Sequence, residues 1–372
     1  ARGFYTVNPK SSKVMVLFGK YKGTVRDNDI SGMRYLNTAT TGSSFSSIYG
    51  IYGQTSDSLT IYDNTIGLDM NTLNTSTIRM YGLYFTNNTD GLDVHDNKIE
   101  KLKIVHNGAT GESNGIYTNG TNKGNIYRNY VDSVMSNGTG GEAVGYYSNN
   151  AGNNINLYNN YFKNLAAPEA SNSSWAVAGV YATNGNVNIY NNTFQIGSGG
   201  AITSSGTNFG GSGIWTSNGT YKLFNNIINI NGTPKGSGAF IPFRPSSTAN
   251  AANITAGSNI YYVNPNANNY IYGEGTTNTA LSNAYYTSGT NAAGVLDASF
   301  NGACGLYRTY KGATDLNSFT ENNLAGTGSY AGTNVPSGTS YAESSALAST
   351  NPNISPDLNN ATRAANPDRG AL

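Results

Sequence analysis

The sequence is poor in cysteine, histidine and charge. Its one cysteine, Cys304, has no partner for an internal disulfide, and its two histidines, His95 and His106, argue against a zinc site. Charged residues make up 11% of the 372 residues and the formal net charge is +1. Lysine and arginine are scattered, so there is no basic patch for nucleic acid or an anionic membrane. We expect neither of these partners and no required cofactor.

Long apolar runs are also absent. No stretch approaches the roughly 18 apolar residues of a membrane span, so we expect none. The first residues, Ala1 to Phe4, lack the apolar core of a signal peptide. We expect either that a signal was removed or that the chain is a piece of a longer protein.

A short motif recurs seven times along the chain. One copy is Ile61-Tyr-Asp-Asn-Thr-Ile66, and the fourth position is always asparagine, at Asn28, Asn64, Asn97, Asn129, Asn160, Asn192 and Asn226. Successive asparagines are 31 to 36 residues apart. The apolar positions three before and two after each asparagine predict two columns that face a common core, where a column is the set of equivalent residues in successive repeats.

A second marker, glycine-x-aromatic, precedes each later asparagine, so every repeat contains at least two short strands. Asn-Gly and Gly-Ser runs between the motifs exclude helical repeats, and a β-propeller blade would need four strands. We therefore predict an all-β fold: a right-handed parallel β-helix, or solenoid, of about seven regular coils. The asparagines would stack at a bend in a hydrogen-bonded ladder.

The C-terminal part is less periodic. The segments 258–262 and 282–286 predict two shorter coils. Residues 301–372 predict an irregular cap, or a link to further chain, after a solenoid over residues 1–300. Inserted Gly- and Ser-rich residues between each asparagine and the next glycine marker, such as 108–114, predict loops along one edge. Such loops either carry a binding face or are tolerated insertions.

The repeats resemble the parallel β-helix repeats of pectate lyases, polygalacturonases and many surface proteins. The tail, with Asp357-Leu-Asn-Asn-Ala-Thr-Arg363 and Pro367-Asp-Arg-Gly-Ala371, resembles the closing segment of large secreted β-helix proteins of Bacteroidetes-type bacteria. Asn360 and Arg369 depart from that pattern. The resemblance implies an adhesin-like protein that is secreted or attached to the cell surface.

Two aromatic columns are the candidate binding residues. Strand alternation predicts that both point outward, as an exposed strip that contacts a glycan, contacts another copy of the protein, or only stabilises the strands. The first column is Tyr52, Tyr84, Tyr117, Tyr147, Tyr181 and Trp215; the second is Tyr62, Tyr127, Tyr158, Tyr190 and Phe224, interrupted by His95.

Asp27, Asp63 and Asp96 are the candidate catalytic residues if the protein is an enzyme. They occupy one column just before the asparagine, where stacked carboxylates suit Ca²⁺ binding or acid–base chemistry. The same column continues with Arg128 and then asparagines, which favours a simple preference for short polar residues at a turn. We therefore expect an extracellular, non-catalytic structural or adhesive module. The alternative is a polysaccharide lyase or glycoside hydrolase.

Overall fold

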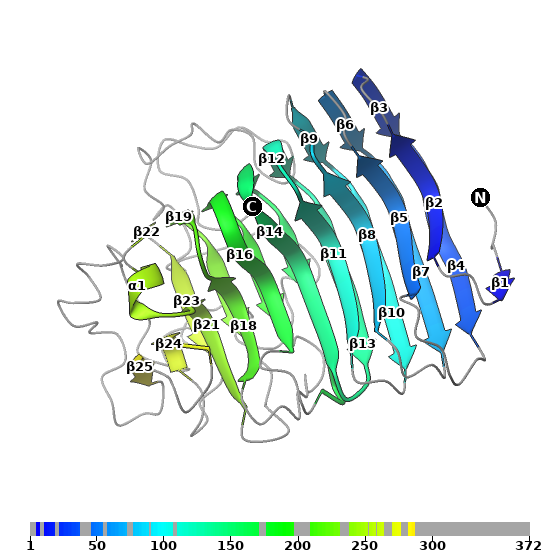
Figure 1. Ribbon diagram of the computed structural model, residues 1–372. Coiled ribbons are helices and arrows are strands. Elements are labelled where there is room, and N and C mark those ends of the chain that lie inside the picture. Colours follow the sequence, from blue (N-terminus) through cyan, green and yellow to red (C-terminus); the bar gives the residue numbers. More distant parts are fainter. Residues whose placement is uncertain are drawn as a thin grey trace, which may run out of the picture.

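The chain forms a parallel β-helix in a computed structural model (Figure 1). The structure describes residues 5–7, 11–18, 22–37, 46–54, 58–72, 77–88, 91–106, 110–170, 176–196, 209–230, 238–251, 253–257, 259–263, 270–276 and 282–286. Among these residues the one helix is the short α1 (Thr248–Ala251), and no helix is long and apolar enough to cross a membrane.

Each coil contributes strands to three faces, which we number in chain order. Face 1 contains β2 (Ser11–Phe18), β5 (Ser46–Gln54), β8 (Ile78–Thr86), β11 (Gly111–Asn119), the first part of β14 (Gly141–Tyr158) and of β16 (Val177–Tyr190), β18 (Phe209–Thr216), β21 (Ala239–Pro245) and β24 (Tyr270–Glu274). Face 2 contains β3 (Lys22–Arg26), β6 (Ser58–Tyr62), β9 (Leu92–His95), β12 (Lys123–Tyr127), the end parts of β14 and β16, β19 (Thr220–Phe224) and β22 (Ile254–Gly257).

Face 3 is a separate sheet of nine strands. Its members are β1 (Tyr5–Val7), β4 (Asp29–Asn37), β7 (Thr65–Thr72), β10 (Lys98–His106), β13 (Tyr130–Asn137), β15 (Tyr161–Lys163), β17 (Thr193–Ile196), β20 (Ile227–Ile230) and β23 (Ile260–Val263). A further strand, β25 (Ser282–Tyr286), follows β24.

The repeat alignment matches the strand register. On face 2, Ile61 is the partner of Val94, and the same column continues through Ile126 and Leu157. Equivalent residues of successive coils therefore lie on neighbouring parallel strands, about 4.8 Å apart. The predicted apolar columns point into one continuous buried core.

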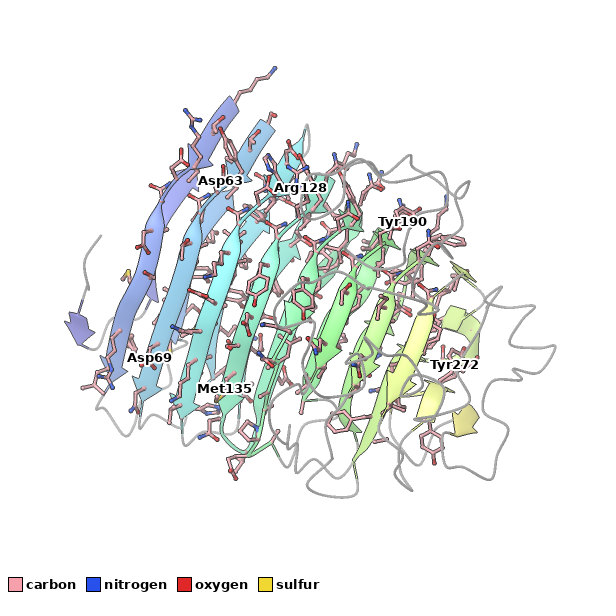
Figure 2. All side chains as sticks on the ribbon, turned by 180° about the vertical axis from the view of Figure 1, so that it is seen from behind. Asp63, Asp69, Arg128, Met135, Tyr190 and Tyr272 are labelled. Carbon is pink, nitrogen blue, oxygen red and sulfur yellow. The ribbon has the colours of Figure 1, made fainter. Side chains whose placement is uncertain are left out.

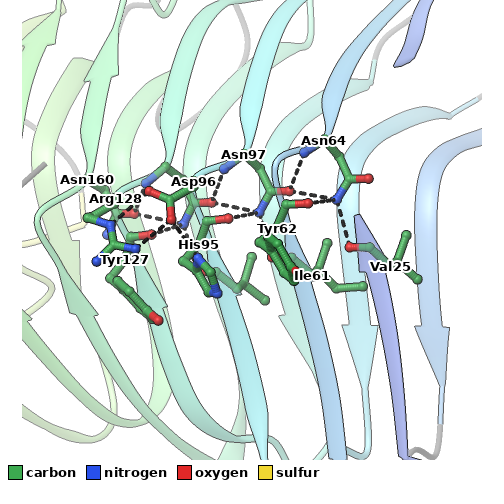
Figure 3. A network of polar contacts seen from close by, with 12 residues as sticks. Val25, Ile61, Tyr62, Asn64, His95, Asp96, Asn97, Tyr127, Arg128 and Asn160 are labelled. Atoms are coloured by element: carbon green, nitrogen blue, oxygen red, sulfur yellow. Dashed lines mark hydrogen bonds and ion pairs between the residues drawn. The ribbon is translucent and has the colours of Figure 1, made fainter. Parts of the chain in front are cut away.

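The asparagine ladder lies at the corner between face 2 and face 3. Each amide nitrogen donates to the amide oxygen of the next coil, as from Asn64 to Asn97 at 2.9 Å and from Asn97 to Asn129 at 2.9 Å. The same nitrogens donate to backbone carbonyls, so the ladder supplies hydrogen-bond donors to the backbone acceptors of the corner (Figure 3). The predicted ladder is confirmed. A second asparagine ladder, which we did not predict, joins Asn88, Asn122 and Asn153 at the corner between faces 1 and 2.

Two details of the C-terminal coils differ from the prediction. Asn259 continues the corner ladder at the usual spacing, 33 residues after Asn226, so residues 259–262 of the predicted segment belong to a full coil rather than a shorter one. Segment 282–286 is not a further coil, because β25 pairs antiparallel with β24. Residues 301–372, Cys304 and the tail motif lie outside the described residues.

The predicted loop edge is smaller than expected in two of the coils that the structure describes. Part of the residues counted as insertions are strand: β10 extends to His106 and β11 begins at Gly111. Between β13 and β14 only the turn 138–140 remains. In these two coils the inserted residues therefore mainly lengthen the strands of faces 1 and 3, whereas segments such as 171–175 and 197–208 lie outside the described residues.

Candidate ligand-binding face

The first aromatic column runs in register along the outside of face 1, and we call it the Tyr52 ladder. The strand register pairs Tyr52 with Tyr84, Tyr84 with Tyr117, and so on to Trp215. Neighbouring ring centroids lie 4.7 to 5.1 Å apart. The six rings thus form one uninterrupted row along the axis of the solenoid.

The expectation of an exposed strip is wrong for this ladder. Tyr117 is 7% and Trp215 is 4% exposed, and the other rings are half-buried. The planes of Tyr52 and Tyr84 lie within 4° of parallel, and those of Tyr84 and Tyr117 within 7°. Stacked rings cover one another's faces, so the first rings of the ladder offer edges and hydroxyls to a ligand rather than a stacking platform.

The hydroxyls along this ladder are tied to amide side chains. Asn119 donates to the Tyr84 hydroxyl at 3.2 Å, and Asn149 donates to the Tyr117 hydroxyl at 2.9 Å. A tyrosine hydroxyl that accepts one bond still carries its own O–H donor. Burial raises the pKa of Tyr117 to about 12, even though the bond from Asn149 opposes this shift. The ladder therefore presents neutral hydroxyl and amide groups at physiological pH.

The second aromatic column forms a ladder on face 2, which we call the Tyr62 ladder. Tyr62 stacks on His95 at 4.9 Å, His95 on Tyr127 at 4.8 Å, and Tyr127 on Tyr158 at 4.9 Å. Tyr190 is 3% exposed, and Tyr62, Tyr127 and Tyr158 are half-buried, so this column is not an exposed strip either. His95 fits between two tyrosines because its ring is also planar and aromatic.

The Asp27, Asp63 and Asp96 column occupies the corner beside the asparagine ladder. All three have positive φ, at 57°, 52° and 55°, and so do Arg128 and the asparagines that continue the column. Aspartate and asparagine tolerate this left-handed conformation better than most residues. Figure 2 shows Asp63, Arg128 and Tyr190 along one edge of the solenoid. Backbone conformation therefore accounts for the residue types in this column.

Asp96 is engaged by two neighbouring side chains. Arg128 donates from Nε at 2.8 Å and from Nη2 at 2.6 Å, and His95 Nδ1 lies 2.7 Å from the second carboxylate oxygen (Figure 3). Burial opposes ionisation of Asp96, but the hydrogen bonds from Arg128 and His95 outweigh it and hold its pKa at about 2. Asp27 and Asp63 are exposed. Arg26 Nε lies 3.6 Å from Asp27 in an exposed ion pair, so the column does not hold a group of free carboxylates.

Face 1 also carries a charged column that the sequence reasoning missed. Arg79 on β8, Glu112 on β11 and Glu142 on β14 are consecutive register partners. Arg79 Nε lies 3.0 Å from a Glu112 carboxylate oxygen. Each of the three precedes a glycine of the second marker by three residues, at Gly82, Gly115 and Gly145. An alignment of the repeats that began three residues before this glycine would have placed the three charged residues in one column.

The two glutamates of this column have raised pKa values. For Glu142, burial is the main cause and the adjacent Glu112 carboxylate adds to it, so the pKa reaches about 8 despite the opposing charge of Arg79. Burial also raises the pKa of Glu112, while Arg79 counteracts it. At neutral pH the carboxyl of Glu142 is protonated, so it can both donate and accept hydrogen bonds.

A separate cavity of about 540 Å³ lies on face 3, with Gly67 and Leu68 among its lining residues. Arg34, Lys101 and Lys103 line it together with the acidic Asp69 and Glu100. Arg34 lies 3.7 Å from Asp69, so part of this charge is already neutralised. Charged side chains of both signs therefore line the cavity.

No group of three histidine, cysteine, aspartate or glutamate residues within the described ranges could hold a metal ion. No protein-family model, curated protein or solved structure matches the chain. Functional inference therefore depends on the geometry of face 1 and its neighbours.

Proposed function

We propose that the protein is an extracellular, non-catalytic structural and adhesive module that contacts glycans through face 1. The observation that carries this proposal is the unbroken Tyr52 ladder, with its tyrosine hydroxyls and the amides of Asn119 and Asn149 on one face. Neutral donors and acceptors beside ring edges match the hydroxyls and C–H groups of sugars. The ladder runs parallel to the axis, so an extended polymer could follow it over several coils.

The stiffness of the solenoid supports the structural half of the proposal. Two asparagine ladders and two aromatic ladders connect coil to coil. In repeat proteins of this kind stability depends on contacts between neighbouring coils. A rod of this construction would hold a contact face at a fixed distance from a surface.

The lyase or hydrolase alternative has less support at the Asp27 column. Asp96 is bound by Arg128 and His95, and its low pKa makes it a poor proton donor at neutral pH. The position has left-handed backbone geometry in every coil from Asp27 to Asn225. We therefore place the function on face 1 rather than at this corner.

The test is affinity electrophoresis of the whole chain in gels that contain soluble glucan, galactomannan, xylan or polygalacturonate. Tyr84→Phe and Tyr117→Phe together remove two hydroxyls from face 1 but keep the rings. We expect the double variant to bind its polysaccharide about tenfold more weakly, which corresponds to two neutral hydrogen bonds. Tyr127→Phe and Tyr158→Phe on face 2 are the matched control and should bind like the wild type.

Three outcomes would contradict the proposal. The first is an absence of retardation in every polysaccharide. The second is equal weakening by the face 1 and face 2 variants. The third is the release of new reducing or unsaturated ends during incubation, because this would make the protein an enzyme.

A further inference from the structure

We propose that Glu112, Asn114 and Glu142 form a subsite on β11 and β14 that binds a neutral sugar unit of the glycan. The inference rests on the proposed function of face 1 and names the place and the chemistry of one contact. It depends on three observations: a pair of neighbouring carboxyl groups, a buried amide without a partner, and a break in the ring stacking.

The carboxyl pair is the first observation. Glu112 and Glu142 are register partners on adjacent parallel strands, so their backbones are about 4.8 Å apart. Arg79, on the other side of Glu112, is bonded to Glu112 at 3.0 Å. Glu142 forms no ion pair with any residue in the described ranges. One carboxylate of the pair is thus neutralised by arginine and the other carboxyl is left for a ligand.

Asn114 is the second observation. It follows Glu112 by two residues on β11, so its side chain leaves the same side of the strand. The residue is 1% exposed, and neither its amide nitrogen nor its amide oxygen bonds to any residue that the structure describes. A buried polar group without a partner costs about 1–3 kcal/mol, and each such group in a native structure calls for an explanation. A sugar hydroxyl could satisfy both the donor and the acceptor.

The aromatic ladder changes at the same two strands. Tyr84 on β8 and Tyr117 on β11 are stacked at 7°, but Tyr117 and Tyr147 on β14 meet edge to face at 72°. In the adjacent column, the stacked pair Tyr49 and Tyr81 is followed by the smaller Asn114 and Val144. Rings therefore give way to smaller side chains where the carboxyl pair lies.

The charge of the subsite selects a neutral ligand. At neutral pH the positive charge of Arg79 balances the negative charge of Glu112, and Glu142 is uncharged because its pKa is about 8. A further titratable group beside Glu142 is Tyr147, whose pKa burial raises. Above pH 8 Glu142 ionises beside Glu112, loses its donor and adds a negative charge. Binding of a neutral sugar should then weaken, and an acidic sugar should be disfavoured throughout.

The experiment compares the whole chain with its Glu142→Gln variant across pH. The probes are soluble glucan, galactomannan and xylan as neutral polysaccharides, with polygalacturonate as the acidic one. We expect wild-type affinity for the bound neutral polymer to fall about tenfold between pH 7 and pH 9.5, with its midpoint near the pKa of about 8. Glutamine mimics the protonated carboxyl, so Glu142→Gln should keep its affinity at both pH values. Glu142→Ala should be weak at both.

Controls separate this subsite from face 1 as a whole. Glu100→Gln, on face 3 and 3.0 Å from Lys98, should leave the pH profile unchanged. Melting temperatures show whether the variants fold. A carboxyl whose folded pKa is raised above its ordinary value destabilises the fold as pH rises between the two, so Glu142→Gln should lose less stability than the wild type between pH 5 and pH 9.

The outcomes are distinguishable from those of the proposed function. If Tyr84→Phe with Tyr117→Phe weakens binding but wild type and Glu142→Gln share one pH profile, the subsite is wrong and the glycan face remains. Tighter binding of polygalacturonate than of every neutral polymer would also overturn the subsite. If no polysaccharide binds at any pH, both inferences fail.

Discussion

Replacing Asn129 with alanine tests how strongly the corner ladder holds the coils together. The Asn129 amide nitrogen donates to Val94 O at 2.9 Å, Tyr127 O at 3.0 Å and Asn160 Oδ1 at 3.0 Å. Its amide oxygen accepts from the Asn97 backbone at 3.1 Å and from the Asn97 amide at 2.9 Å. The residue is 0% exposed. Alanine would remove all of these bonds.

The expected loss of unfolding free energy depends on which hydrogen-bonding groups around Asn129 keep a partner. Asn97 Nδ2 still donates to Ile61 O and His95 O, so its loss is partial. The backbone N–H of Asn97 loses the acceptor at Asn129, and Val94 O loses a donor. An unsatisfied buried group costs about 1–3 kcal/mol, and a replaced neutral bond about 1 kcal/mol, so we expect a total loss of about 3–5 kcal/mol.

Asn28→Ala is the matched control at the N-terminal end of the ladder. Its amide makes two bonds, to Arg26 O at 2.9 Å and Asn64 Oδ1 at 2.8 Å, and is partly exposed, so we expect a loss of about 1 kcal/mol. The assays are denaturant unfolding and hydrogen exchange of the Asn97 amide. Equal losses for the two variants, or unchanged protection of the Asn97 amide in Asn129→Ala, would refute this account of the ladder.

Two further predictions concern packing and charge. In Gly115→Ala the new Cβ would lie 2.6 Å from Val131 Cγ1 and 2.7 Å from Gly145 O, so thermal unfolding should show a loss of about 1–3 kcal/mol. Gly32→Ala, where nothing lies within 4 Å but φ is +73°, should lose about 1 kcal/mol, and an equal loss in both would contradict the steric argument. The depressed pKa of Asp96, about 2, stabilises the fold above its ordinary pKa near 3.8, and this contribution disappears as pH falls toward 2. Acid titration of Arg128→Met should therefore show a shallower loss of stability between pH 4 and pH 2; an unchanged slope would contradict it.

The fold was predictable because an in-register solenoid converts each sequence column into a physical column. Asn64 and Asn97 could be assigned to one ladder from their spacing, since any other register would bring unlike residues together. The apolar positions Ile61 and Val94 followed in the same way. The reversal at β25 was not predictable, because Ser282–Tyr286 repeats the composition of a coil strand without the pairing partners that determine its direction.

The candidate site was only partly predictable. The sequence located the Tyr52 ladder, but ring orientation depends on side-chain torsions and packing, so a column of tyrosines does not distinguish an exposed platform from a stack that covers its own faces. Glu112 and Glu142 were overlooked because the residues before the glycine marker were interpreted as loop. Their interaction becomes visible only when those residues are recognised as paired strands.

Face 1 follows the rules of a stable β-helix on its first strands and departs from them at β11 and β14. From Tyr52 to Tyr117 the rings stack on their neighbours, and such cross-strand aromatic pairs stabilise a sheet. At β11 and β14 the stacking changes, two glutamates are neighbours, and the Asn114 amide is buried without a partner among the described residues. The paired glutamates and the unpartnered amide cost stability, and neither is needed to build a coil, since the Asn114 column continues with Val144 and Ala178. Local departures from folding rules concentrate at functional sites, so their coincidence on two strands favours a ligand contact there over a defect in the repeat.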